Sequence, residues 1–298
     1  MIINERDENN MKVLVSSDTS CLVNLEVLIK NGISVFPLNV IVDGEEFLDT
    51  VTIDQDALKD AMRSNKIIQT STPPLGEVIE YFEKLFIEGY DHIIHFTISS
   101  KLSSMYSLFL NVANEHFEGK VTVIDSYGLS ATMLSNVLYA NDEAKKGTPV
   151  EEIYNTIEER KHDGYLIFIP ENLTALKNGG RISPAVAAVG NVIGLKPVIT
   201  LTEGELVKVG MTTVVKKAFM EYVSKVKEQF PSENYDYSLV GFDAKPVVFD
   251  SINNYLKEID SDSVSGLIPI NVCAHCGPGT IGVVISPKIN GKSLKEFV

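Results

Sequence analysis

The sequence predicts an α/β protein with two domains, an N-terminal α/β/α domain on a parallel sheet and a C-terminal α/β domain with a mixed sheet. In the first half, apolar runs of strand length alternate with segments of helix length. Strands that are apolar on both faces and separated by helices are typical of a parallel sheet covered on both sides. The second half contains two apolar runs joined by Thr202-Glu203-Gly204-Glu205. Such a hairpin favours a second domain with a mixed sheet.

The N-terminal half carries the βα alternation. Strands are expected at 11–17, 33–42, 91–98 and 120–125, and helices at 20–31, 54–65, 74–88, 102–117, 129–146 and 149–162. Asp54 and Thr148 with Pro149 have the chemistry of helix starts. Residues 1–10 are polar and charged, and we expect them to form a disordered extension. We place the two domains at 11–163 and 164–298.

The C-terminal half has a different pattern. A strand is expected at 165–170, followed by a short helix at 173–177 that Gly179 and Gly180 end. The hairpin pairs 197–201 with 206–209. The apolar run 267–272 is expected to be a buried strand that leads to His275.

The composition excludes several classes of function. The chain has 298 residues, 44% hydrophobic residues and a net charge of −14, and this acidity opposes nonspecific binding to nucleic acid or to an anionic membrane. No apolar run approaches the roughly 20 residues of a membrane helix. Three cysteines without a paired framework favour a reducing compartment. We therefore expect a cytoplasmic protein without nucleic-acid partners or membrane insertion.

Hydroxyl groups and one imidazole follow apolar runs at several places. Thr70 lies after a short apolar run, Ser99 and Ser100 follow 93–98, and His275 precedes a Gly-Pro-Gly turn. In open α/β sheets ligands gather where the carboxyl ends of strands meet helix N-termini. The same threonine and serines have the chemistry of helix caps, and that alternative stays open.

The order of several motifs resembles the DegV family, which includes the fatty-acid-binding subunits of bacterial fatty acid kinase. The resemblance runs from about Met11 to the C-terminus. Its most specific elements are Leu176-Lys177-Asn178-Gly179-Gly180-Arg181-Ile182-Ser183 and His275-Cys276-Gly277-Pro278-Gly279-Thr280. Further elements are Ser99-Ser100-Lys101-Leu102-Ser103, Ile124-Asp125-Ser126, and Phe36-Pro37-Leu38-Asn39-Val40 with Asp43-Gly44 and Asp49.

The resemblance implies the family's EDD fold, with one long-chain fatty acid in an apolar tunnel between the domains. It implies that Thr70, Ser99 or Ser100, and His275 hold the carboxylate, and we add Arg181 to the ligand-binding set. Arg181 has two other open roles, support of a hinge and cover of a helix end. The implied protein is not an enzyme. It has no cofactor beyond the fatty acid, and it presents the carboxylate to a separate fatty acid kinase subunit.

Other functions compete with this hypothesis. A serine-type lipid hydrolase would use Ser99 or Ser100 with His275, but no Gly-x-Ser-x-Gly elbow is present. A self-contained kinase lacks a phosphate-binding Gly-x-x-x-x-Gly-Lys-Ser/Thr loop. Cys273, His275 and Cys276 form too sparse a set for a metal site. Thr213-Val214-Val215 stands where many relatives carry Arg-Thr-Arg, and this departure bears on docking of a kinase.

Overall fold

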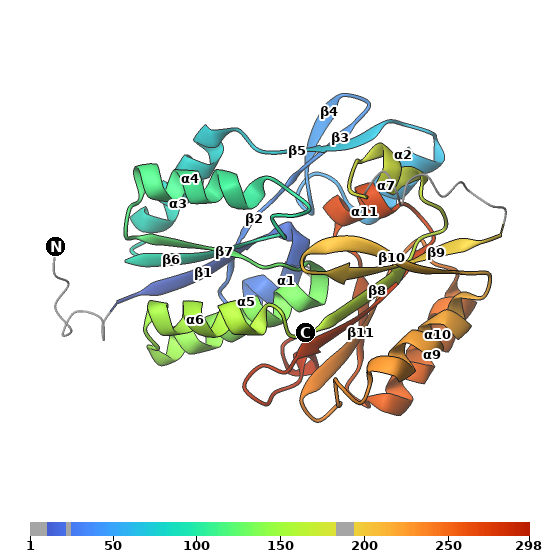
Figure 1. The fold of residues 1–298 in the computed structure, drawn as a ribbon. Coiled ribbons are helices and arrows are strands. Elements are labelled where there is room, and N and C mark those ends of the chain that lie inside the picture. The colour runs from blue at the N-terminus through green and yellow to red at the C-terminus, as the bar shows by residue number, and fades with distance from the viewer. Residues whose placement is uncertain (1–10, 22–24, 183–193) are drawn as a thin grey trace.

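The computed structural model describes residues 11–21, 25–182 and 194–298 (Figure 1). The predicted extension at 1–10 and Ser183 lie outside the described residues. The predicted α/β fold is confirmed, with a parallel sheet in the N-terminal part and a mixed sheet in the C-terminal part. In the part of the chain that is described, no helix combines the length and apolar character needed to cross a bilayer.

A four-stranded parallel sheet forms the centre of the N-terminal part. Its order is β2-β1-β6-β7, and its strands are β1 (Val13–Asp18), β2 (Ser34–Phe36), β6 (His92–Thr97) and β7 (Val121–Asp125). The helices α3 and α4 lie on one side of this sheet and α5 and α6 on the other (Figure 1). The helices of this part are α1 (Leu25–Lys30), α2 (Gln55–Arg63), α3 (Leu75–Ile87), α4 (Met105–His116), α5 (Ser130–Lys146) and α6 (Val150–Arg160).

The predicted strand 33–42 is wrong in one respect, because it is two strands in different sheets. After β2 the chain leaves the parallel sheet, and β3 (Asn39–Val42) pairs antiparallel with β4 (Glu45–Leu48) and β5 (Ile68–Ser71). Pro37 stands at the break and cannot donate a ladder hydrogen bond. The three-stranded sheet projects above the rest of the molecule (Figure 1). Thr70 therefore lies within a strand and not after one.

The predicted helix at 20–31 also differs. A 3₁₀ turn, η2, covers Thr19–Cys21, and the described part of the α-helix covers Leu25–Lys30. Residues 22–24 lie outside the described part of the chain. Asp54 does cap its helix as predicted, since its side chain accepts a hydrogen bond from the backbone N–H of Ala57 at 2.8 Å. The other predicted helices and strands of this half begin and end within a few residues of their expected bounds.

The C-terminal part is built on a six-stranded mixed sheet of order β10-β9-β8-β13-β11-β12. The β9–β10 hairpin is confirmed and is longer than expected. The strands are β8 (Tyr165–Ile169), β9 (Lys196–Thr202), β10 (Glu205–Thr212), β11 (Tyr235–Phe242), β12 (Val264–Leu267) and β13 (Thr280–Pro287). The helices are α7 (Thr174–Asn178), α9 (Val215–Val226), α10 (Pro246–Ile259) and α11 (Ile270–Cys276).

The predicted strand at 267–272 is wrong. Strand β12 ends at Leu267, and helix α11 begins at Ile270 after Pro269. Proline suits this place because its fixed φ is compatible with a helix start. His275 therefore lies in the last turn of a short helix, and Gly277, with φ 76°, ends that helix.

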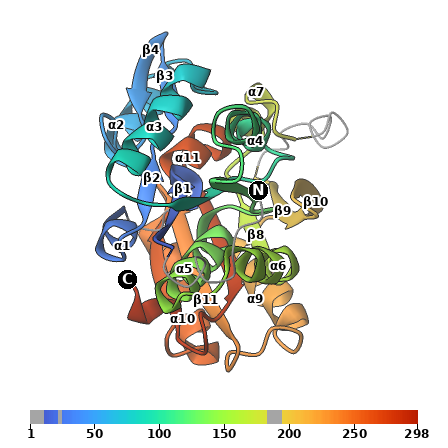
Figure 2. The same ribbon diagram turned by 90° about the vertical axis from the view of Figure 1, so that its left-hand side faces the viewer.

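The two sheets share one continuous apolar core. Helix α5 lies against both β1 and β13, so it joins the parallel sheet to the mixed sheet. The helices α7 and α11 lie between the three-stranded sheet and the six-stranded sheet (Figures 1 and 2). Core residues from both parts belong to one cluster, among them Leu14, Leu134 and Val284. The domain boundary near 163 stays a proposal.

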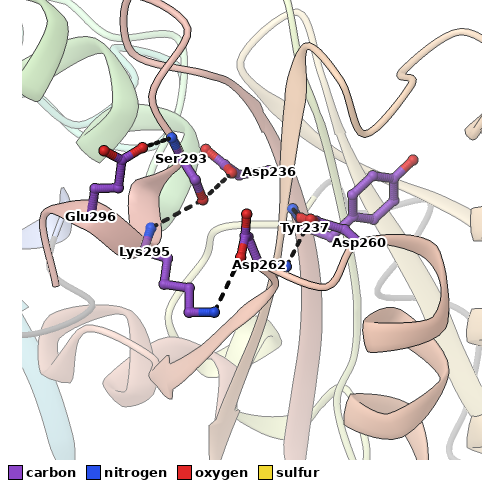
Figure 3. A network of polar contacts seen from close by, with 7 residues as sticks. All are labelled: Asp236, Tyr237, Asp260, Asp262, Ser293, Lys295 and Glu296. Atoms are coloured by element: carbon purple, nitrogen blue, oxygen red, sulfur yellow. Dashed lines mark hydrogen bonds and ion pairs between the residues drawn. The ribbon is translucent and has the colours of Figure 1, made fainter.

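The C-terminal segment is fixed to strand β11 of the mixed sheet by buried polar contacts (Figure 3). The Ser293 hydroxyl donates to Asp236 Oδ1 at 2.7 Å, and the Leu294 N–H donates to Asp236 Oδ2 at 2.8 Å. Glu296 accepts from the Ser293 N–H at 3.0 Å, which completes a capping box for the 3₁₀ helix η3 (Leu294–Glu296). The end of the chain is thus part of the folded unit.

Candidate ligand-binding site

An apolar cavity lies where the two parts of the chain meet. It encloses about 1070 Å³ of space free of protein atoms, including its opening to solvent. Its walls come from the three-stranded sheet, the β6–α4 loop, helices α7 and α11, and strands of the mixed sheet. The apolar lining residues are Leu38, Ile98, Leu102, Met105, Leu129, Leu166, Phe168, Leu176, Leu206, Val240, Ile268, Val272 and Val284. This lining suits an aliphatic chain.

Thr70 and His275 meet on the cavity wall. Thr70 Oγ1 lies 2.8 Å from His275 Nε2, and both residues line the cavity. They are 205 positions apart in sequence, on β5 and α11. Thr70 does not cap the following helix, since the N-cap of α3 is Pro74 and no side chain caps it. The structure thus brings together two of the predicted site residues.

His275 is confined on its other side by helix α7. A methyl group at Gly179 would lie 2.2 Å from His275 Nδ1, so glycine is needed there to admit the ring. Nδ1 is buried and has no hydrogen-bond partner among the described residues. Burial, with the nearby positive charge of Arg181, lowers the pKa of His275 to about 4. The imidazole is therefore neutral at neutral pH.

Arg181 lines the cavity and also joins the two parts of the chain. Its Nε–H donates to the carbonyl of Leu102 at 3.3 Å, and its Nη1 donates to the carbonyl of Gly179. The first contact reaches the N-terminal part and the second fixes the turn beside His275. The guanidinium thus supports the site and places a positive charge near its polar end.

Ser99 and Ser100 are placed differently from Thr70, and neither lines the cavity. The buried Ser99 hydroxyl donates to the carbonyl of Gly204 at 2.9 Å, at the tip of the β9–β10 hairpin. The Ser100 N–H donates to Asp125 Oδ1 at 3.0 Å. The serine of this loop that lines the cavity is Ser103. Sequence reasoning missed Ser103, although it belongs to the same Ser-Ser-x-Leu-Ser element.

A second polar group lines the same cavity and was also missed. It consists of Ser20 and Asn271. Asn271 Nδ2 donates to Ser20 Oγ at 2.8 Å, and the Asn271 N–H donates to Asp49 Oδ2 at 3.1 Å. Burial raises the pKa of Asp49 to about 7. Had 270–276 been predicted as a helix, the spacing of four residues would have placed Asn271 on the face of His275.

The described residues contain no group of three His, Cys, Asp or Glu side chains arranged to hold a metal ion. Cys273 and Cys276 on α11 are buried free cysteines. Burial also raises the pKa of the Cys273 thiol. The polar groups of the cavity are therefore hydroxyls, amides, one neutral imidazole and one guanidinium.

The sequence matches the family model for DegV, described as an uncharacterised protein family, over residues 12–288. The chain belongs to the DegV family. A DegV domain-containing protein of Clostridium perfringens is 28% identical over 279 residues, which cover 92% of this chain and 98% of the relative.

Solved structures of the family share the fold. A DegV lipid-binding protein from Thermotoga maritima is 25% identical with a TM-score of 0.82, and the match covers 93% of this chain and 99% of that one. A fatty-acid-binding DegV family protein from Thermus thermophilus is 24% identical with a TM-score of 0.83, covering 93% and 100%. A stearic acid-binding protein from Eubacterium ventriosum is 23% identical with a TM-score of 0.82, covering 93% and 98%.

Proposed function

We propose that this protein binds one long-chain fatty acid in the cavity between its two parts and acts without catalysing a reaction. The observation that carries the proposal is the joining of a long apolar lining to a polar end at which Thr70 meets His275. The relatives described above as binding lipid, fatty acid or stearic acid support the same class of ligand.

The polar end has the donors that a carboxylate needs. A carboxylate that leaves water must receive hydrogen bonds, or its burial costs several kcal/mol. Neutral His275 can donate from Nε2 to Thr70 Oγ1, which leaves the Thr70 hydroxyl proton for the ligand. Such a chain of donors strengthens the outer hydrogen bond. Ser103 and Arg181 line the same cavity and complete the proposed carboxylate site.

The tail supplies most of the affinity in this proposal. Each methylene group removed from water contributes about 0.8 kcal/mol, and thirteen apolar side chains line the cavity. Leu206 on the β9–β10 hairpin is among them, so the hairpin covers part of the bound acyl chain. The Ser99 hydroxyl keeps the tip of this hairpin against the N-terminal part. Ser99 thus fixes the hairpin and does not itself line the cavity.

The contacts of His275 argue against the serine hydrolase alternative. Its Nε2 pairs with Thr70 and not with Ser99 or Ser100. Among the described residues its Nδ1 has no carboxylate to orient it, whereas a catalytic triad needs such an orienting group.

We further propose that the bound carboxylate is presented to a separate fatty acid kinase subunit. Arg181 places a positive charge beside the carboxylate site, which suits an acyl-phosphate after transfer. The segment before α9, Thr213 and Val214, carries no arginine. A kinase that docks through paired arginines at that segment would associate slowly with this protein.

Mass spectrometry of an organic extract tests the proposal. The full-length protein is purified without added lipid, denatured, and extracted beside a sample of Gly179→Ala protein handled identically. We expect about one long-chain fatty acid per wild-type chain and much less in the variant. A wild-type protein that carries no fatty acid, and that does not take one up from added hexadecanoate, would contradict the proposal.

A further inference from the structure

The second polar group lies about one helical turn from the proposed carboxylate site. Asn271 and His275 are four residues apart on α11, so their side chains share one face of the helix with a rise of about 6 Å between them. Both line the cavity, together with Ser20. An acyl chain that is anchored at Thr70 and His275 and runs along α11 toward Asn271 passes close to this group within its first few carbons.

Asn271 carries an unpaired acceptor. Its Oδ1 is buried and has no hydrogen-bond partner among the described residues. Asn271 is more than nine-tenths buried, with an exposed fraction of 5%. Its amide nitrogen is already used, because it donates to Ser20 Oγ at 2.8 Å. Buried polar atoms of native proteins nearly always have partners, so this oxygen calls for a donor.

Asp49 fixes this group from behind the cavity wall. Its Oδ2 accepts from the Thr19 hydroxyl at 2.9 Å and from the Asn271 N–H at 3.1 Å, while its Oδ1 is unpaired among the described residues. Of these two unpaired oxygens, Asp49 Oδ1 and Asn271 Oδ1, only the second belongs to a residue that lines the cavity. The Asn271 amide oxygen is thus the one that a ligand can reach.

The chemistry of the group selects the ligand. Ser20 Oγ accepts from Asn271, so its own proton is left for an acceptor. The group therefore offers an acceptor and a donor, and a hydroxyl is the group that both donates and accepts. A second carboxylate would face the unpaired amide oxygen of Asn271 and the buried carboxyl of Asp49, which oppose it. A plain methylene would leave the amide oxygen unpaired.

We infer that Ser20 and Asn271 form a subsite for a hydroxyl group near the carboxyl end of the acyl chain, so that the cavity accepts hydroxylated long-chain fatty acids. The inference rests on the proposed function, because it needs the carboxylate at Thr70 and His275. It deepens that function by naming a class of substrate. A hydroxyl at the methyl end of the acyl chain would lie away from this subsite, so the apolar lining should reject it.

Titration of delipidated protein with three acids of equal length tests the inference. The probes are hexadecanoic acid, 3-hydroxyhexadecanoic acid and 16-hydroxyhexadecanoic acid, measured by displacement of a fluorescent fatty acid. For the wild type we expect the 3-hydroxy acid to bind within threefold of hexadecanoic acid, or tighter. The 16-hydroxy acid should bind at least tenfold more weakly.

Asn271→Leu and Ser20→Ala test the residues. In Asn271→Leu we expect the ratio of the two dissociation constants, 3-hydroxy over unsubstituted, to rise at least tenfold, and in Ser20→Ala at least threefold. Ser103→Ala is the matched control, because it should weaken both acids by the same factor and leave the ratio unchanged. Thermal unfolding of each apo variant shows whether it folds. If Asn271→Leu or Ser20→Ala does not fold, the other variant tests the subsite.

The outcomes separate the two proposals. If hexadecanoic acid binds but the 3-hydroxy acid is rejected as strongly as the 16-hydroxy acid, the subsite is wrong and fatty-acid binding stands. An unchanged ratio in both Asn271→Leu and Ser20→Ala would also overturn the subsite. If none of the three acids binds, the proposed function fails and the inference fails with it.

Discussion

Two hydroxyl-bearing segments of similar sequence chemistry have different surroundings in this protein. Thr70 on β5 lies on the cavity wall with its hydroxyl against His275, whereas the Ser99 hydroxyl is buried against the backbone of the β9–β10 turn. One hydroxyl is available to a ligand, and the other joins two parts of the fold. The difference shows that a hydroxyl residue near an apolar run can be assigned to a ligand site only when the tertiary partner of that hydroxyl is known.

Gly179→Ala should have the largest effect on ligand binding, because it disturbs the contact between Thr70 and His275. The added methyl group would lie 2.2 Å from His275 Nδ1, so the ring must move away from Thr70. Overpacking of this kind costs roughly 1–3 kcal/mol of unfolding free energy. We expect fatty-acid affinity to fall by about 10- to 100-fold, the effect of losing a buried partner. Fluorescent displacement and chemical denaturation measure the two quantities.

Gly76→Ala is the control for that variant. Gly76 lies in helix α3, and a methyl group there has no atom within 4 Å. Its affinity should equal that of the wild type, and its stability should be equal or higher, because alanine favours a helix. Equal affinities for Gly179→Ala and the wild type would show that His275 has no part in binding.

The pH dependence of stability tests whether His275 is buried as a neutral ring. Its folded pKa of about 4 lies below the ordinary 6.5, so the unfolded chain takes up a proton first as the pH falls. This contribution to stability is complete above pH 6.5 and is lost progressively toward pH 4. Between pH 7 and pH 5 the loss from His275 is about 2 kcal/mol. His275→Asn should therefore lose correspondingly less stability than the wild type over that interval.

The buried carboxyls act in the opposite direction. Burial raises the pKa of Asp18 to about 6 and that of Asp49 to about 7, so the folded state takes up their protons first and gains stability as the pH falls. Both are present in wild type and variant, so their contributions cancel in the comparison. His116→Asn, at an exposed position, is the control. A His275→Asn profile parallel to the wild type would contradict the buried neutral ring.

The sequence predicts those features that local contacts determine, and it fails for those that tertiary contacts determine. The parallel sheet and the hairpin follow from local patterns, and motifs suggested His275 and Thr70, which both line the cavity. The run 267–272 was misread because a short apolar stretch does not distinguish a strand from a buried helix. Without α11, Asn271 could not be placed beside His275. Ser103 could not be separated from Ser99 because the choice depends on Gly204, 105 residues from Ser99.

Ser99→Ala and Ser103→Ala should have the smallest effects, and together they test which of the two serines contacts the ligand. Ser99→Ala removes the hydrogen bond to Gly204, and we expect a loss of about 1 kcal/mol in unfolding free energy with little change in affinity. Ser103→Ala should leave stability nearly unchanged and weaken fatty-acid binding several-fold. Denaturation and displacement assays on both variants measure this. If Ser99→Ala lost affinity and Ser103→Ala lost stability instead, Ser99 would be the serine that contacts the ligand.

We propose that Thr70 and His275, and not Ser99, hold the carboxylate. The ¹³C chemical shift of hexadecanoate labelled at its carboxyl carbon reports this contact directly in the bound state. We expect the bound signal of Thr70→Val protein to move clearly from its wild-type position, and that of Ser99→Ala protein to stay where the wild-type signal lies. A signal that moves in Ser99→Ala and stays unchanged in Thr70→Val would contradict the account.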